Sequence, residues 1–320
     1  MTIIFSINYH TNWGQRLFVC GSVPELGKNV TTKAIPMEYM GNGEWKLVLT
    51  VKKAQSFTYK YLVFDENTKT YTEEYMPDRT AIVSANANAC YLDDTWRSNG
   101  VDKTFYSAAF TEGLIARSSK SKKAESIELP TTIRFTLSAP RIAAGYQLAI
   151  LGSCDALGNW DTKKAFVLSD AAFPLWQGYI DATDLNGVID YKYVIYDSKK
   201  KMVVSWEEGE NRTLDTAAIT GSMTYNRNDE VFRYGIAPWK CTGVAIPVFS
   251  LRTNNSFGIG EFSDLRLMSD WAKETGQKII QTLPITDTTR FRTNADSYPY
   301  SRKNITQTTS AVSRIKIAGK

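Results

Sequence analysis

The sequence predicts a mainly β protein, with two tandem β-sandwiches followed by an incomplete α/β fragment of the kind that begins a TIM barrel. Three observations support this fold class. Residues 1–226 contain an internal repeat, each repeat consists of short alternating strand-like runs, and a strand–helix–strand pattern begins after residue 240. An internal repeat defines the domain organisation before any other signal is interpreted.

The repeat is visible in landmarks that recur at a spacing of 131 to 133 residues. The matched landmarks are VCGSVPELGKN (19–29) with ILGSCDALGNW (150–160), Trp45 with Trp176, Tyr59-Lys60-Tyr61 with Tyr191-Lys192-Tyr193, and Asp78-Arg79-Thr80 with Asn211-Arg212-Thr213. So many matches with so little drift predict two copies of one domain of about a hundred residues.

Each repeat reads as short strands separated by turn residues. The strand-like runs are IIFSINYH, RLFVCG, EWKLVLTV, FTYKYLVF and TAIVSA in the first repeat, and TIRFTLSA, QLAILG, WQGYIDA and DYKYVIYD in the second. Several short strands at regular spacing, without an amphipathic helix, are typical of a β-sandwich. We therefore predict sandwiches over residues 1–97 and 130–226, joined by a linker over residues 98–129.

The pattern changes near Trp239. A buried-strand run (VAIPVFSL, 244–251) precedes a helix that starts after Ser263 as N-cap and stops at Gly276, and IIQTLPI (279–285) forms a second strand. This is a βαβ unit of the kind that builds an α/β barrel. The unit spans residues 227–301, far short of the roughly 250 residues of a barrel. Residues 302–320 form a divergent polar tail.

Composition narrows the function classes. The net charge is +5, and its basic run at Ser118–Lys123 has no interleaved aromatic residues, so we expect a solvated linker and no nucleic-acid partner. The single histidine, His10, rules out a multi-histidine metal site, and we expect neither a metal nor a cofactor. Chemistry in this chain would have to depend on carboxylates.

Four cysteines without C-x-x-C spacing are expected to be free thiols in a reducing, cytoplasmic compartment. They are Cys20, Cys90, Cys154 and Cys241. The N-terminus has no basic segment followed by an apolar core, which argues against a signal peptide. No apolar run approaches the length of a membrane span, so we expect no membrane partner. The sequence does not indicate an oligomeric state.

The second repeat has the residue types that bind sugars. A flat sugar face stacks on an exposed aromatic ring while polar groups contact the hydroxyls. Trp160 follows a Leu-Gly-Asn turn and Trp206 lies in a polar segment, which favours exposure of both rings. Lys192, Glu207 and Asn211 add hydrogen-bonding groups. The alternative is that Trp160 and Trp206 both belong to the core. For a third tryptophan of this repeat, Trp176, we prefer the core interpretation.

The motifs GS-x-x-x-LGNW (152–160), YKY (191–193) and WEEGENRTL (206–214) resemble the starch-binding modules of carbohydrate-binding module family 20. The resemblance covers most of residues 130–225 and implies an immunoglobulin-like β-sandwich. It also implies that Trp160, Lys192 and Trp206 form the principal α-glucan site, with Glu207 and Asn211 nearby. The expected partners are starch, glycogen or a related α-glucan.

The first repeat resembles the same family but differs at the principal site. Asn29 and Glu73 stand where the two tryptophans would be, and only Lys60 of the set remains. The resemblance implies a secondary glucan site at Trp13 and Tyr39, with Lys60 as a further glucan contact. In the second repeat the first of these places holds Ala144, with Tyr146 close by. We therefore hypothesise that each repeat retains a different site.

Residues 242–301 resemble the start of the barrel of glycoside hydrolase family 77, the 4-α-glucanotransferases. The resemblance rests on GVAIPVFSLRTNNSFGIGEFSDL, WAKETGQKIIQTLPI and DSYPYS. It implies transfer of α-1,4-glucan segments by a retaining mechanism with two carboxyl groups. These carboxyl groups belong to later barrel strands, so we place no catalytic residue in this chain. Possible substrate contacts are Asp296, Ser297 and Tyr300.

We therefore predict an α-glucan-binding, targeting part of a 4-α-glucanotransferase that is inactive by itself. One alternative is a non-catalytic tandem scaffold that binds a protein partner through the same aromatic residues, since exposed tryptophans also serve protein interfaces. Another is activity regained by assembly with a separate remainder of the barrel.

Overall fold

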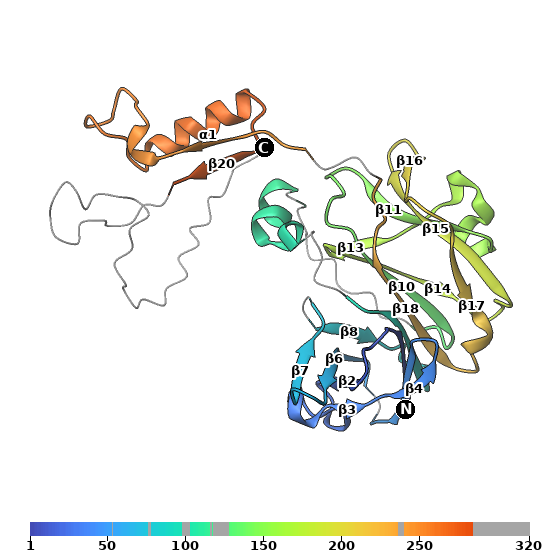
Figure 1. Cartoon of the computed structure of the whole chain (residues 1–320). Coiled ribbons are helices and arrows are strands. Elements are labelled where there is room, and N and C mark those ends of the chain that lie inside the picture. The colour runs from blue at the N-terminus through green and yellow to red at the C-terminus, as the bar shows by residue number, and fades with distance from the viewer. Residues whose placement is uncertain are drawn as a thin grey trace. The chain divides into compact units, whose positions relative to one another are not determined.

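The computed structural model describes residues 1–52, 54–75, 78–97, 103–115, 117, 128–235 and 240–283 (Figure 1). It has two compact units, Met1–Ile236 and Ala237–Lys320. The first unit contains two β-sandwiches. We call the sandwich of strands β1–β9 module one and the sandwich of strands β10–β18 module two.

Module one has two layers of antiparallel strands, apart from the parallel pair β1–β9. One layer runs in the order β4–β5–β1–β9, and the other runs β3–β2–β6–β7, with β8 also paired to β6. The strands are β1 (Thr2–Asn8), β2 (Gln15–Gly21), β3 (Ile35–Pro36), β4 (Glu38–Gly41), β5 (Glu44–Thr50), β6 (Ser56–Asp65), β7 (Thr70–Glu73), β8 (Arg79–Ile82) and β9 (Ala89–Thr95). Each predicted run of the first repeat forms one of these strands, whereas β3, β4, β7 and β9 were not predicted.

Module two repeats this plan. Its layers are β13–β14–β10–β18 and β12–β11–β15–β16, with β17 paired to β15. The strands are β10 (Thr132–Ser138), β11 (Gln147–Gly152), β12 (Phe166–Val167), β13 (Ser169–Ala172), β14 (Leu175–Asp181), β15 (Val188–Asp197), β16 (Met202–Trp206), β17 (Arg212–Asp215) and β18 (Met223–Val231). Two short helical turns, Lys103–Tyr106 and Ala109–Leu114, lie between the modules in sequence.

The two modules share one sheet, which the sequence did not predict. Strands β9 and β18 pair in parallel from Met223 opposite Ala89 to Asn228 opposite Asp94. The result is a single eight-stranded sheet in the order β13–β14–β10–β18–β9–β1–β5–β4. We call it the shared sheet. The two sandwiches therefore form one body rather than two separate domains on a linker.

Each module has its own apolar core between its two layers. Alternate residues of β1, namely Ile3, Phe5 and Ile7, face the core of module one, as expected for a half-buried strand. The predicted core position of Trp176 is confirmed, because its ring is fully buried and its Nε1 donates to the Ala139 carbonyl at 3.1 Å. Burial of a large apolar side chain stabilises the fold by roughly 1.5–3 kcal/mol.

The second unit contains the predicted βαβ pattern. Strands β19 (Gly243–Ile246) and β20 (Ile279–Thr282) pair in parallel, and helix α1 (Asp264–Glu274) connects them. Gly276 has the left-handed φ of 73° that ends a helix. Ser263 occupies the predicted N-cap position, but its side chain makes no capping bond. Instead, the Asp264 carboxylate accepts from the Glu261 N–H at 2.8 Å.

Large apolar side chains of the second unit are exposed, including Phe257, Phe262 and Trp271. Both of its strands are shorter than predicted, and Ile279 of β20 is also exposed. Within the described ranges, the structure has no helix long and apolar enough to cross a membrane.

Candidate functional site

The outer face of module two carries a small apolar platform. Strands β11, β15 and β16 turn alternate side chains away from the main core, because successive residues of a strand point to opposite faces. The buried members of this platform are Ala149, Leu151, Val194 and Tyr196, and the partly buried Trp160 and Val203 pack against them. The platform supports aromatic rings at the surface of the sheet.

Trp160 and Trp206 lie together on this face. Trp206 is opposite Val194 in the strand register and is 40% exposed. Trp160 arrives from the turn Asp155–Trp160, and the two ring centroids are 6.4 Å apart with an interplanar angle of 35°. Two tilted rings on one face of the sheet can stack against an apolar sugar face.

The backbone that presents Trp160 is strained. Trp160 has a φ of 63°, in the left-handed region that bulky residues rarely adopt. The turn depends on Gly158, because a Cβ there would lie 2.6 Å from the Lys164 carbonyl oxygen. Left-handed backbone costs a non-glycine residue about 1–2 kcal/mol, and such strain concentrates at functional sites.

Polar groups flank the ring pair. Lys192 lies two residues before Val194 on β15, so its side chain is on the same face as Trp206. Its Nζ donates to the Gly209 carbonyl at 2.6 Å, which fixes the ammonium beside the loop that follows Trp206. Asn211 is exposed in the same loop. The structure thus brings together Trp160, Trp206, Lys192 and the loop that carries Asn211.

Glu207 is not part of this exposed set, which corrects the expected glucan contact. It is only 2% exposed, and it accepts from the backbone N–H of Tyr193 at 3.1 Å. Its carboxylate also accepts from Arg212 at 2.8 and 2.9 Å and from Arg233 at 3.1 Å. Burial raises the pKa of Glu207, but the bonds from both arginines outweigh it, so the pKa lies below its ordinary value. Glu207 anchors the loop next to Trp206.

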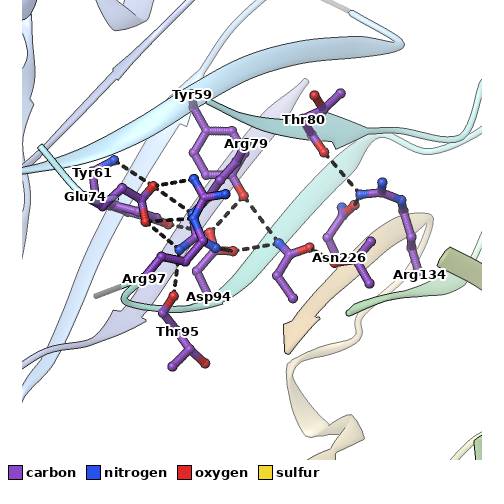
Figure 2. Close-up of polar contacts among 12 residues, drawn as sticks. Tyr59, Tyr61, Glu74, Arg79, Thr80, Asp94, Thr95, Arg97, Arg134 and Asn226 are labelled. Carbon is purple, nitrogen blue, oxygen red and sulfur yellow. Dashed lines mark hydrogen bonds and ion pairs between the residues drawn. The ribbon is translucent and has the colours of Figure 1, made fainter. Parts of the chain in front are cut away.

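Module one contains the same buried network, which Figure 2 shows. Glu74 accepts from Arg79 at 2.7 and 2.9 Å and from Arg97 at 3.1 and 3.2 Å. Arg79 also bonds Asp94 at 2.8 Å, and Asp94 accepts from the hydroxyls of Tyr59 and Tyr61. Asp229 has this role in module two, where it accepts from the hydroxyls of Tyr191 and Tyr193.

Sequence reasoning missed these supporting residues. They are Arg79, Asp94 and Arg97 in module one, and Arg212, Asp229 and Arg233 in module two. A signal was present, because Glu74 and Arg79 have the same spacing as Glu207 and Arg212. A glutamate and an arginine that recur together in both repeats indicate a structural pair.

The outer face of module one lacks the ring pair. Glu73 is opposite Leu62 in the register, which is the place of Trp206 opposite Val194. Asn29, with a φ of 62°, occupies the place of Trp160. Lys60 donates to Glu73 at 2.7 Å. This ion pair stands where module two presents its two rings and its lysine.

The expected secondary residues of module one lie in different layers. Trp13 is fully exposed in the turn after β1, and Tyr39 on β4 is 55% exposed. The Tyr39 ring lies 5.0 Å from that of Trp45, and its hydroxyl accepts from the Gly43 N–H at 3.2 Å. Lys60 does not join them, since it lies on β6 in the other layer and pairs with Glu73. Its placement in this set is therefore corrected.

In module two the corresponding place is filled by Arg117 from the segment between the modules. Its guanidinium lies 4.5 Å from the Trp176 ring centroid and bonds Asp170 at 2.5 Å. It also donates to the carbonyls of Ala143 and Tyr146. Tyr146 is partly exposed, but Arg117 occupies the position that Tyr39 has over Trp45. This contact leaves the two modules with different surfaces at this edge.

The expected barrel contacts Asp296, Ser297 and Tyr300 lie outside the described residues, as do the tail 302–320 and most of the predicted linker.

These observations define a class of protein: a tandem of carbohydrate-binding β-sandwiches. The chain belongs to the family described as the starch binding domain, which residues 1–92 and 130–225 match over more than half of its length. Residues 246–310 match the family described as 4-alpha-glucanotransferase. The resemblance expected from the sequence is confirmed for both parts, and the chain joins two starch-binding domains to a 4-alpha-glucanotransferase segment.

The chain is also similar to individual proteins named 4-alpha-glucanotransferase. The 4-alpha-glucanotransferase DPE2 of Oryza sativa subsp. japonica is 29% identical over 325 residues, covering 95% of this chain and 33% of that protein. A 4-alpha-glucanotransferase of Chlamydia caviae is 49% identical over 59 residues, covering 18% of this chain and 10% of that protein. This chain therefore spans a third or less of the length of these relatives.

Among solved structures, the family 20 module of the maltotetraose-forming amylase from Pseudomonas saccharophila STB07 is 23% identical. The match covers 29% of this chain and 98% of the amylase module, with a TM-score of 0.25.

Proposed function

We propose that the chain binds starch, glycogen or a related α-1,4-glucan through the outer face of module two. The observation that carries this proposal is the tilted pair of Trp160 and Trp206 on an apolar platform. The rings stack on apolar sugar faces, while Lys192 and Asn211 bond hydroxyl groups. The strained backbone at Trp160 supports the same function. Module one has the same left-handed turn with Asn29, a residue type that tolerates this conformation, whereas module two places a bulky ring there at a cost.

Module one contributes a second glucan site at Trp13 and Tyr39 in this proposal. On its principal face, Asn29 and the Lys60–Glu73 ion pair stand at the positions of the two module-two tryptophans. The two modules thus divide the work. We assign them to residues 1–97 and 130–226, with residues 98–129 as the connecting segment.

The parent activity in this proposal is transfer of α-1,4-glucan segments by a retaining mechanism, with the modules holding the polymer near the barrel. Asp296, Ser297 and Tyr300 are proposed substrate contacts of that barrel. We place it in the cytoplasm, since Cys20, Cys90, Cys154 and Cys241 are free thiols.

The test is calorimetric titration of the full chain with β-cyclodextrin, beside retention on insoluble starch. The double variant Trp160→Ala/Trp206→Ala is expected to lose at least about tenfold in affinity at that site. Trp271→Ala is the matched control, because Trp271 is 44% exposed in the other unit and lies outside the site. It should bind like the unaltered chain.

Equal binding by the folded double variant and the control would refute the proposal. If the unaltered chain bound neither β-cyclodextrin nor starch, the alternative of a scaffold that contacts a protein partner through these tryptophans would replace it.

A further inference from the structure

The shared sheet holds the two modules in opposite orientations. Equivalent edge strands, β9 and β18, lie side by side in parallel. Two equivalent parallel neighbours are related by an approximate twofold axis along the strands, and such an axis turns the sheet over. The second layer of module one must then cover one face of the shared sheet, and the second layer of module two the other.

Side-chain contacts agree with this geometry. Asp94 of β9 faces the core of module one, where it bonds Tyr59 and Tyr61. Its register partner Asn228 points to the same face and donates to Asp94 at 2.6 Å. The neighbouring residue Asp229 faces the core of module two, where it accepts from Tyr191 at 2.8 Å. The two cores therefore lie on opposite faces of one sheet.

Each candidate glucan site lies on the side of the shared sheet that its own module covers. Tyr39 pairs with Trp45 in the β4–β5 register, and Trp45 faces the core of module one. Tyr39 is thus on the module-one face of the shared sheet, at its edge strand β4. Trp160 and Trp206 lie on the outer surface of the layer that covers the opposite face.

The junction between the modules is well fixed. Arg227 of β18 bonds Asp93 of β9 at 2.5 Å, and the rings of Tyr91 and Tyr225 stack at 4.9 Å. On the other face, Arg134 of β10 donates to the Thr80 carbonyl of β8 at 3.1 Å (Figure 2). A continuous ladder with buried bonds on both faces leaves little freedom for hinge motion, because separation would expose unpaired backbone groups.

We propose that this rigid tandem bridges two separate glucan chains, one on each face of the shared sheet, rather than gripping one chain at two points. The inference rests on the proposed function of the two sites. A flexible linker would let both sites turn toward one polymer surface, whereas a shared sheet fixes them facing apart. Bridging of this kind brings a second glucan chain close to one that is already bound.

The test mixes the full chain with dilute glycogen and follows particle size by dynamic light scattering. Bridging predicts that the hydrodynamic radius rises at least about twofold at intermediate protein concentration. It should fall again at excess protein, when separate protein molecules saturate the glucan chains and each holds only one particle. Trp13→Ala/Tyr39→Ala and Trp160→Ala/Trp206→Ala should each abolish clustering. Each double variant should still bind β-cyclodextrin at its remaining site.

The outcomes separate this inference from the proposed function. If calorimetry finds both sites occupied by β-cyclodextrin but glycogen does not cluster, bridging is wrong and the binding function stands. Clustering by a single-site variant would also overturn bridging, because self-association would then be the cause. Absence of β-cyclodextrin binding would overturn both.

Discussion

The outer faces of module one and module two share a scaffold but differ in the side chains they present. In each module, the strand at this face is followed directly by a buried glutamate, Glu74 or Glu207, that is held by two arginines. Both turns have a left-handed residue at the position of Trp160. At the equivalent positions, module two presents the rings of Trp160 and Trp206, whereas module one presents Asn29 and an ion pair. Buried polar networks fix the backbone, and solvent-facing positions remain free to change function.

The largest expected effect breaks the shared scaffold. Replacement of Arg79 or Arg212 by methionine leaves a buried glutamate and a buried aspartate without their main partner. Loss of one partner of a buried ion pair costs about 3–5 kcal/mol. We expect both variants to lower the free energy of unfolding by similar amounts in denaturant titrations. A loss below 1 kcal/mol in one module alone would show that the two networks are not equivalent.

The same networks predict acid sensitivity. The pKa of Glu74 and that of Glu207 both lie below the ordinary value of 4.5 in the folded protein, because arginine bonds outweigh burial. A depressed pKa stabilises the fold above the unfolded pKa, and this contribution is lost as pH falls through the folded pKa. We expect the midpoint of thermal unfolding to decline below pH 4.5. Glu207→Gln should decline less steeply, and an unchanged slope would contradict this cause.

The turn at residue 160 allows binding and stability to be separated. Trp160→Asn installs the residue that module one has at this position. Asparagine tolerates left-handed backbone, which favours the variant by up to about 1 kcal/mol, but the ring is lost from the platform. We therefore expect only a small net change in the free energy of unfolding. Affinity for β-cyclodextrin should fall at least about tenfold with loss of the ring. Retained affinity in calorimetry would remove Trp160 from the site.

The smallest effect is expected when the two equivalent lysines, Lys192 and Lys60, are replaced in turn. Lys192→Met removes one charged hydrogen-bonding group from the proposed site, which costs about 1 kcal/mol or several-fold in affinity. Lys60→Met removes a lysine that is paired with Glu73 instead, so glucan affinity should not change. Calorimetry on both variants tests this difference, and equal losses would mean that module one also uses its outer face.

The strands and the βαβ pattern were predictable because both depend on local residue order. Apolar residues alternate with period two in the strands, and Gly276 marks the end of the helix. The ring pair was predictable because Trp160 ends a turn and Trp206 is followed by a polar segment. The pairing of β9 with β18 was not, since ACYLDDT has a broken hydrophobic pattern and its neighbour lies over 130 residues away. Burial of Glu207 was also missed, because its arginine partners act through tertiary contacts.

The most direct test of this account transfers the site. Asn29→Trp/Glu73→Trp in the full chain would place both rings on the scaffold of module one and free Lys60 from its ion pair. Calorimetry with β-cyclodextrin is predicted to show one additional bound molecule per chain compared with the unaltered protein. If the variant keeps its thermal stability but binds no additional β-cyclodextrin, the ring pair is not sufficient for glucan binding and the account is contradicted.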